Sequence, residues 1–309
     1  MNQDNKDILV SISCITYNHA PYIRECLDGF MMQQTNFPFE VLIHDDASTD
    51  GTTEIIKEYE AKYPNIIKPL YEEENQWVKE RRGSAVFNFP RAQGKYIALC
   101  EGDDYWTDPL KLQKQVDFLE SHPDYVMCSH VVDMYKQAER TQVKWSVQEA
   151  QEYDIEKLVY GPWIYHPLSV MFRLAAFHID KYSRYKHSKD MTLFYHLLSS
   201  GKGYYMADNM AVYRQHADGV WSGINDEEKL ISNFYYCKSL YEVERNNLAL
   251  AYMCEILIKG HGRLHLMKHW RIALYVLACY TRQHGLTVGL HFLYHKYLLG
   301  KDIRPWTNL

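Results

Sequence analysis

Several familiar signatures are missing from this 309-residue chain. Its seven cysteines include no Cys-x-x-Cys pair, so the sequence predicts neither a zinc site nor a disulfide framework. Neither a Gly-x-Gly-x-x-Gly nor a Gly-x-x-x-x-Gly-Lys-Ser/Thr motif occurs, which excludes the usual dinucleotide fingerprint and the P-loop. The apolar run at 272–280 has nine residues, whereas a membrane-spanning helix needs about 20.

Targeting and glycosylation signals are missing as well. The first seven residues are polar, with no apolar segment typical of a signal peptide, and no Asn-x-Ser/Thr acceptor occurs. Together with the unpaired cysteines, these absences favour a reducing compartment. We therefore expect a cytoplasmic protein, and a peripheral position on the inner face of the membrane stays open.

Charge is distributed unevenly along the chain. The formal net charge of −5 gives no general case for nucleic acid binding. Residues 229–309, however, hold 11 Lys or Arg against 4 Asp or Glu, a net charge of +7, so residues 1–228 carry −12. Such a basic region suits an anionic lipid surface, although a dimer interface or a solvated basic face explains it equally well. With 47% hydrophobic and 24% charged residues, the chain has the composition of a soluble globular protein.

Strands and helices alternate through the first part of the chain. Residues 9–15 form a β-rich apolar run, a polar turn follows at 16–20, and Pro21 begins a helix with an apolar face. Residues 39–43 and the polar turn 44–51 repeat this plan. The alternation predicts right-handed βαβ units. We therefore predict an α/β fold with a Rossmann-like, mixed but mostly parallel sheet flanked by helices, followed by a C-terminal helical appendage.

In the stretch 94–106, a short apolar run ends in three acidic side chains, Glu101, Asp103 and Asp104. An apolar run bounded by glycine is typical of a central strand, and ligands of parallel sheets bind beyond the carboxyl ends of the strands. Bunched carboxylates repel one another, so a fold keeps them together mainly where a cation offsets the repulsion. The alternative is a solvated acidic loop that caps the next helix, but Asp108, followed by proline, already supplies that N-cap. Oxygen ligands predict Mg²⁺ or Mn²⁺.

Three ordered segments resemble the family 2 glycosyltransferases of GT-A fold: Ser-Cys-Ile-Thr-Tyr-Asn at 13–18, Asp-Asp-Ala-Ser-Thr-Asp-Gly-Thr at 45–52 and Glu-Gly-Asp-Asp at 101–104. The resemblance implies a transferase for hexosyl or N-acetylhexosaminyl groups that acts in polysaccharide biosynthesis. Its donor would be a nucleoside diphosphate sugar, most often a UDP sugar in this family.

The resemblance also implies which residues bind the donor and the metal. Carried over to this sequence, the nucleotide-sugar contacts are Thr16, Tyr17, Asn18, Asp46, Glu101 and Gly102. The metal ligands are Asp103 and His216, the latter resembling the histidine that completes the metal or diphosphate site in many GT-A enzymes. A hydrogen bond to backbone amides explains Asp104 as well as metal contact does, and Asp45 is either part of the site or purely structural.

Further residues are implied for the acceptor side. Trp163, in the aromatic stretch 161–167, suits a sugar face or a lipid-linked acceptor, or else packs inside the protein. Inverting transfer needs a carboxylate that takes the proton of the acceptor hydroxyl. Asp190 stands at the start of a helix where the family carries this base, although Lys189 replaces the usual glutamate. Service as the helix N-cap is the alternative role for Asp190.

The sequence thus predicts a metal-dependent, inverting glycosyltransferase with a saccharide or lipid-linked acceptor. Residues 1–226 would form the transferase domain, with a nucleotide-sugar-binding half (1–130) and an acceptor half (131–226), and residues 227–309 a basic helical region. The departures at Glu101 and Lys189 leave open a non-catalytic nucleotide-sugar-binding or membrane-docking protein on the same scaffold. We expect no nucleic acid partner, and an oligomer stays open.

Overall fold

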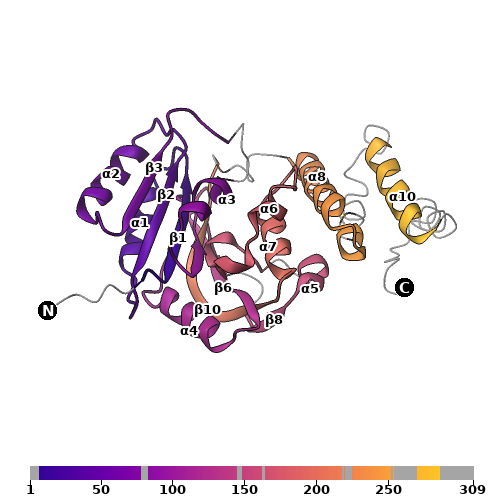
Figure 1. Cartoon of the computed structure of the whole chain (residues 1–309). Helices are drawn as coiled ribbons and strands as arrows, with labels where there is room; N and C mark the ends of the chain where they lie inside the picture. Colours follow the sequence, from indigo (N-terminus) through magenta and orange to yellow (C-terminus); the bar gives the residue numbers. More distant parts are fainter. Residues whose placement is uncertain are drawn as a thin grey trace. The chain divides into compact units, whose positions relative to one another are not determined.

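The computed structural model describes residues 7–77, 83–144, 148–161, 164–217, 219, 225–251, 253 and 270–285. The chain divides into two compact units. The first comprises Met1–Ser183 and Ser188–Ala217, and the second comprises Arg184–His187 and Asp218–Leu309. The first unit contains the sheet, and the described elements of the second are helices (Figure 1).

One sheet, with ten strands among the described residues, organises the first unit. The strands are β1 (Val10–Thr16), β2 (Phe39–Asp45), β3 (Ile67–Tyr71), β4 (Tyr96–Leu99), β5 (Tyr105–Trp106), β6 (Tyr125–Lys136), β7 (Thr141–Lys144), β8 (Gln151–Tyr153), β9 (Met171–Arg173) and β10 (Lys202–Gln215). Their order is β3-β2-β1-β4-β9-β6-β10-β5, with β7 beside β6 and β8 beside β10. β1 to β4 pair in parallel, as do β6 and β10, and the antiparallel β9 joins the two groups. The α/β fold with a mixed, mostly parallel sheet is therefore confirmed.

Helices cover both faces of this sheet. The first unit has α1 (Ile23–Met31), α2 (Thr52–Lys62), α3 (Gly83–Phe87), α4 (Lys111–Ser121), α5 (Ile155–Tyr160), α6 (Ile179–Tyr182) and α7 (Asp190–Leu198), and the second has α8 (Asp226–Glu244) and α10 (Trp270–His284). Figure 1 shows α1 and α2 on one side of β1–β3 and α3 on the other. This is the layering expected of βαβ units.

The side-chain alternation of β1 gives the two faces of the sheet different roles. Ile12 and Cys14 are fully buried in the core that α1 and α2 cover. Ser11 and Ser13 point to the opposite face, where the Asn88 amide donates to Ser13 Oγ at 3.0 Å and to the backbone carbonyl of Cys14 at 3.1 Å. Because buried polar groups need such partners, this network fixes the strand whose end reaches the candidate site.

The start of α4 differs from the prediction. Asp108 is not the N-cap, because the helix begins at Lys111 and Leu110 takes the N-cap position. Asp108 Oδ1 nevertheless accepts the backbone N–H of Leu110 at 2.8 Å, and Asp108 Oδ2 pairs with Lys114 Nζ at 2.8 Å. Asp108 therefore lies two residues before the N-cap and supports the helix start from there.

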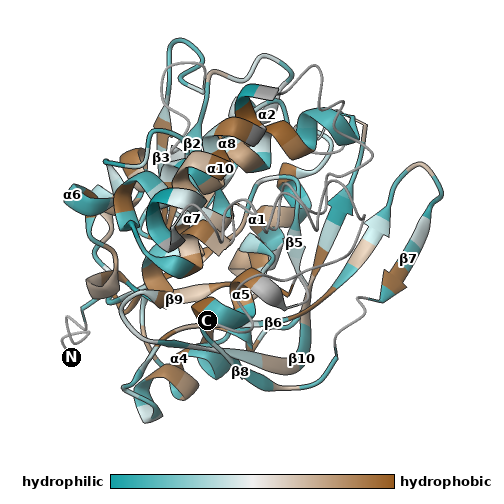
Figure 2. Ribbon diagram, turned by 90° about the vertical axis from the view of Figure 1, so that its right-hand side faces the viewer, coloured by the Kyte–Doolittle hydropathy of each residue, from teal (hydrophilic) through white to brown (hydrophobic). Residues whose placement is uncertain are grey.

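At its edge the sheet carries an exposed arm. β7 pairs antiparallel with β6, and all four of its residues are exposed. Figure 2 shows this strand extending beyond the neighbouring strands, with hydrophilic and hydrophobic residues along it.

The six cysteines among the described residues are free thiols.

The second unit pairs α8 with α10. The Tyr275 hydroxyl donates to Glu242 Oε1 at 3.1 Å, and the Tyr241 hydroxyl donates to Gln283 Oε1 at 3.2 Å. Phe234, Leu240 and Tyr241 of α8 are buried. None of the helices in the described ranges combines the length and the apolar character needed to cross a bilayer.

Candidate active site

The acidic turn follows β4 and lies directly against the end of β1. The backbone N–H groups of Cys100 and Gly102 donate to the carbonyls of Ser13 and Ile15, at 3.2 and 3.0 Å. A Cβ atom on Gly102 would lie 2.7 Å from Thr16 Oγ1 and 2.8 Å from Thr16 Cβ. Only glycine allows this close approach, which brings two of the predicted segments together.

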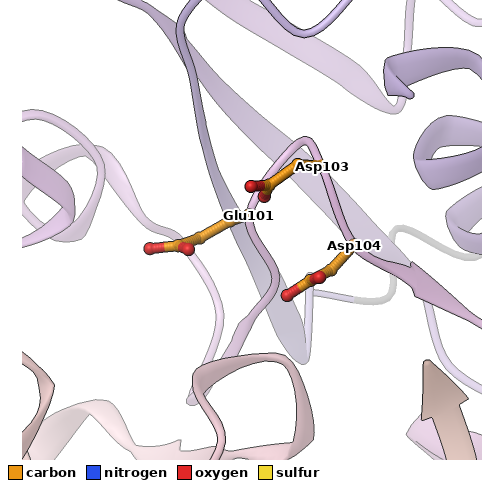
Figure 3. Close-up of side chains that lie close together, drawn as sticks. All are labelled: Glu101, Asp103 and Asp104. Atoms are coloured by element: carbon orange, nitrogen blue, oxygen red, sulfur yellow. The ribbon is translucent and has the colours of Figure 1, made fainter. Parts of the chain in front are cut away.

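Three carboxylates gather on this turn. In Figure 3 the side chains of Glu101, Asp103 and Asp104 project to the same side, and an oxygen from each lies within 4.8 Å of the others. Burial and the nearby carboxylates of Asp103 and Asp190 raise the pKa of Glu101 well above its usual value. Burial and Asp103 likewise raise the pKa of Asp104. A divalent cation would offset this repulsion.

Two histidines flank Asp103. His216 Nε2 donates to Asp103 Oδ2 at 3.0 Å, and His19 Nε2 lies 3.8 Å from the same oxygen. Burial alone would raise the pKa of Asp103, but the two imidazoles outweigh burial and lower that pKa. Burial lowers the pKa of His19 more than the carboxylate raises it. The sequence pattern indicated His216 but not His19, although His19 directly follows Asn18 in the same polar turn.

Arg214 is a second residue that the sequence motifs did not assign to the site. Its backbone N–H donates to Asp104 Oδ1 at 2.7 Å, and its guanidinium donates to the backbone carbonyl of Asp103 at 2.6 Å and to Glu25. The guanidinium also lies 4.7 Å from the centre of the Tyr105 ring. Arg214 thus holds the acidic turn against β10. In the sequence, the feature that could have indicated this role is a charged residue at the end of an apolar strand. Asp104 does bind a backbone amide, from β10 rather than from its own turn.

The turn after β1 combines buried and exposed side chains. Thr16, the last residue of β1, is buried, whereas Tyr17 is 46% exposed. Asn18 has a left-handed backbone (φ 54°), its N–H donates to Ser48 Oγ at 2.9 Å, and its Oδ1 accepts the N–H of Thr49 at 2.8 Å. Asn18 therefore joins the turns after β1 and β2, and Tyr17 is left facing solvent.

The paired acids after β2 have different partners. Asp45 accepts from the backbone N–H of Ser48 at 3.2 Å and from the hydroxyl of Thr53, which is a structural role at the start of α2. Asp46, 8% exposed, accepts the backbone N–H groups of Gln76 and Trp77. The backbone N–H of Asp46 in turn donates to Thr16 O at 3.0 Å, which places this residue beside the turn after β1.

Asp190 lies at the start of α7, and its charge contributes to the raised pKa of Glu101. Lys189 occupies the N-cap position, and its backbone N–H is held by Thr192 Oγ1 at 3.3 Å. Asp190 is therefore the first helical residue rather than the N-cap. Asp190 is exposed to solvent. Desolvation by the neighbouring protein nevertheless raises the pKa of its carboxyl group, by more than the charge of Lys189 lowers it.

The expected aromatic platform is only partly described. Trp163 lies outside the described residues. Tyr165 is 1% exposed and packs edge-to-face on Tyr153, with ring centres 4.5 Å apart. Tyr165 therefore belongs to the core and not to a surface that could stack on a sugar.

The possible ligand atoms of this site suit a hard divalent cation. Among the described residues, Asp103 Oδ1 and Thr16 Oγ1 are buried without a hydrogen-bond partner. Carboxylate oxygens with one imidazole nitrogen suit Mg²⁺ or Mn²⁺. Asp103, with Glu101 and His216 beside it, could hold such an ion, whereas Asp104 already binds the amide of Arg214.

This sheet, with an acidic turn at the carboxyl ends of its parallel strands, defines the GT-A class of glycosyltransferase folds. The family model "Glycosyl transferase family 2" matches residues 11–182, and the chain belongs to that family. Both the fold and the family predicted from the sequence are thereby confirmed.

Individual known proteins are similar over different lengths. An uncharacterized protein of Mycobacterium tuberculosis is 38% identical over 235 residues, which cover 71% of this chain and 63% of that protein. The UDP-Glc:alpha-D-GlcNAc-diphosphoundecaprenol beta-1,3-glucosyltransferase WfaP of Escherichia coli is 33% identical over 113 residues, 37% of this chain and 42% of WfaP. The crystal structure of S. aureus TarS 1-349 in complex with UDP-GlcNAc matches 82% of this chain and 73% of that chain, with a TM-score of 0.59 and 19% identity. This chain thus spans less than two thirds of the length of the mycobacterial relative.

Proposed function

We propose that this protein is a metal-dependent, inverting glycosyltransferase that moves a sugar from a nucleoside diphosphate sugar to a saccharide or lipid-linked acceptor. The observation that carries the proposal is the acidic turn, in which Glu101 and Asp103 meet His216 beside the end of β1. A site with these groups suits the negative charge of a departing diphosphate only when a cation is also present.

Mg²⁺ or Mn²⁺ would be held mainly by Asp103, with His216 and Glu101 beside it. Such an ion neutralises the charge that develops on the leaving phosphate oxygens, which contributes several kcal/mol to stabilising a transition state. Arg214 and Gly102 keep the acidic turn in place, through the hydrogen bonds to Asp103 and Asp104 and through the close approach to Thr16.

Asp190 is the base in this proposal. The acceptor oxygen attacks the anomeric carbon, the bond from that carbon to the diphosphate oxygen breaks, and the hydroxyl proton passes to Asp190. A carboxylate with a raised pKa holds that proton more readily than an ordinary aspartate does. Because attack and departure occur on opposite faces of the carbon, the configuration inverts.

The donor's nucleoside would lie against Thr16, Tyr17 and Asp46, which the backbone brings together at the ends of β1 and β2. We favour a UDP sugar because TarS crystallised in complex with UDP-GlcNAc and the name of WfaP begins with UDP-Glc. WfaP's name also specifies a diphosphoundecaprenol acceptor, which supports a lipid-linked acceptor here.

We further propose that residues 1–226 form the transferase domain, with a nucleotide-sugar half (1–130) and an acceptor half (131–226). The basic region 227–309 would dock on anionic lipid at the inner face of the membrane, and a dimer interface is its alternative use. The net charge of +7 over residues 229–309 supports the lipid proposal.

Titration calorimetry and product release on a panel of donors test the main proposal. The protein should bind UDP more tightly with Mn²⁺ than with a chelator, and one UDP sugar with a matched acceptor should release UDP. Metal-dependent binding without transfer or hydrolysis across the whole panel would favour the rival, a non-catalytic nucleotide-sugar-binding protein.

A further inference from the structure

A cleft of about 540 Å³ lies in the second unit, where α8 and α10 end. The described residues that line it are Tyr241, Arg245, Arg282 and Gln283. The Tyr241 hydroxyl donates to Gln283 Oε1 at 3.2 Å, and the side-chain amide of Gln283 donates to Asn247, so hydrogen bonds hold the two helix ends together at the cleft. A cleft of this size can take a small molecule or the head group of a larger one.

Two exposed arginines bring like charges to this cleft. Burial raises the pKa of the Tyr241 phenol, whereas the charges of Arg245 and Arg282 both lower it, so both guanidinium groups lie near the same ring. Within the described ranges, neither guanidinium forms an ion pair with a carboxylate. The two acidic residues at the end of α8 have other partners, because Glu242 accepts from Lys238 and Tyr275 and Glu244 accepts from Tyr185.

The backbone at the end of α8 fixes one of these arginines. Arg245 is the C-cap residue, with a left-handed backbone (φ 52°) that favours glycine. Its N–H donates to Tyr241 O at 3.0 Å, its Nε donates to Glu242 O at 3.1 Å, and its guanidinium lies 5.4 Å from the centre of the Tyr241 ring. The protein thus places a large cationic side chain where the backbone would prefer none.

Interaction with the helix dipole is the simpler explanation for these arginines. A positive charge is favourable near the C-terminal end of a helix, and Arg245 and Arg282 each lie at such an end. That effect explains one charge on each helix. It does not explain why both charges line one cleft without an acidic residue among its described lining, since like charges repel. An anion in the cleft would remove this repulsion.

The exposed face of α10 indicates where such an anion comes from. Its exposed residues Arg271, Leu274, Ala278 and Arg282 are three or four positions apart, so they share one face of the helix. Leu274 on this face is 53% exposed. A helix face that combines arginine with exposed leucine is typical of helices that lie on a lipid surface.

We propose that Arg245 and Arg282 form a binding site for the phosphate group of an anionic membrane lipid. This inference deepens the proposed docking of the region 227–309 on lipid and rests on it. Each guanidinium presents a planar fork of N–H donors that matches two phosphate oxygens. The site would bind one lipid head group by direct hydrogen bonds, in addition to the general attraction of a basic region to an anionic surface.

The test measures binding of the full chain to vesicles of phosphatidylcholine mixed with phosphatidylglycerol, and to vesicles of phosphatidylcholine alone. The parent should bind the mixed vesicles more tightly. Arg245→Gln and Arg282→Gln should each weaken that binding by roughly 10- to 150-fold, the range for a lost hydrogen bond to a charged group. Arg271→Gln is the matched control, because it removes the same charge from the same face of α10 outside the described lining of the cleft. Its loss should be only about fivefold, the share of one basic residue near an anionic surface.

A charge-conserving variant separates the site from general attraction. Arg282→Lys keeps the charge but not the planar fork, so it should recover only part of the affinity. Full recovery, or equal losses in Arg271→Gln and Arg282→Gln, would overturn the site and leave attraction by net charge. Urea unfolding of each variant should match that of the parent, because both arginines are exposed.

Inorganic phosphate tests the other source of the same chemical group. If phosphate raised the melting temperature of the parent but not of Arg282→Gln, while the parent bound neither kind of vesicle, the ligand would be a soluble phosphate and the lipid would be the wrong occupant. A parent that responds to neither phosphate nor vesicles would contradict both the site and the lipid docking. Mn²⁺-dependent binding of UDP by the same preparation would then still support the proposed transferase.

Discussion

His216 Nε2 lies 3.0 Å from Asp103 Oδ2, although 113 residues separate the two in the chain. The contact joins the end of β10 to the turn after β4, so the candidate site is assembled from both parts of the sheet. Arg214 makes the same connection two residues earlier, through the backbone of the acidic turn. Disturbing either strand end should therefore affect the binding of metal and donor together.

Asp103→Asn should abolish Mn²⁺-dependent donor binding. An amide is a poorer ligand than a carboxylate, and the charge of the diphosphate would then lack compensation. Calorimetry with UDP and Mn²⁺ measures the effect, and Asp117→Asn, which changes an exposed carboxylate on α4, is the control. Unchanged Mn²⁺-dependent affinity in Asp103→Asn would contradict the assignment of the acidic turn as the metal site.

Asp190→Asn should reduce turnover by roughly 10²- to 10⁴-fold, the usual range for a lost acid–base group, while donor affinity stays intact. Asparagine is close to isosteric at the first position of α7, so the substitution removes the proton acceptor with little change in shape. Steady-state rates and calorimetry on the same preparation separate the two quantities. Equal turnover would show that Asp190 is not the base and would leave Asp180, Asp208 or Asp218 as the candidates. A parallel loss of donor affinity would instead place Asp190 in the nucleotide site.

Gly102→Ala should destabilise the fold by about 1–3 kcal/mol, the typical cost of overpacking. The added Cβ would lie 2.7 Å from Thr16 Oγ1 and 3.0 Å from Ile23 Cδ1, so the acidic turn must move away from β1. UDP affinity with Mn²⁺ should fall as well. Gly83→Ala is the matched control, because its Cβ would meet Ile15 at an ordinary 3.7 Å. Equal stability of the two variants in urea would contradict the prediction.

Lys111 should make stability depend on pH. Its side chain is fully buried, and Nζ donates to Gln115 Oε1 at 2.7 Å and lies 4.0 Å from the centre of the Trp106 ring. Burial lowers the pKa of Lys111 from 10.5 to about 7. Below pH 7 both folded and unfolded states carry the charge, so the cost of burying it is fully present. Between about pH 7 and 10.5 only the unfolded state keeps the proton, so stability should rise with pH.

Chemical denaturation of the parent and of Lys111→Met, from pH 6 to 10, measures this effect. The variant's advantage in the free energy of unfolding should be largest at pH 6 and shrink as pH rises. Its size should be on the order of a few kcal/mol, because one pKa unit corresponds to about 1.4 kcal/mol. Lys62→Met, at an exposed position on α2, should show no pH-dependent difference from the parent. A constant gap between parent and Lys111→Met would contradict the lowered pKa.

By itself the sequence determined the type of fold and the position of the acidic turn. Alternating apolar runs and polar turns are local patterns, and burial of the apolar residues forces them into strands and helices of a βαβ sheet. The acidic residues after β4 could be placed at a strand end for the same reason. The local motif also contains Gly102. The physical reason for a glycine at this position, however, is the close contact with Thr16.

Only the tertiary structure decided which side chains are free to act. For Asp104 the sequence left metal contact and a hydrogen bond to backbone amides equally open, and in the structure the amide of Arg214, 110 residues away, occupies one of its oxygens. Asp46 likewise turned out to hold the loop that carries Trp77. Hydrogen bonds between distant segments depend on how the strands are ordered in the sheet, and that order follows from the packing of the whole unit. Residue type and local spacing do not determine that order.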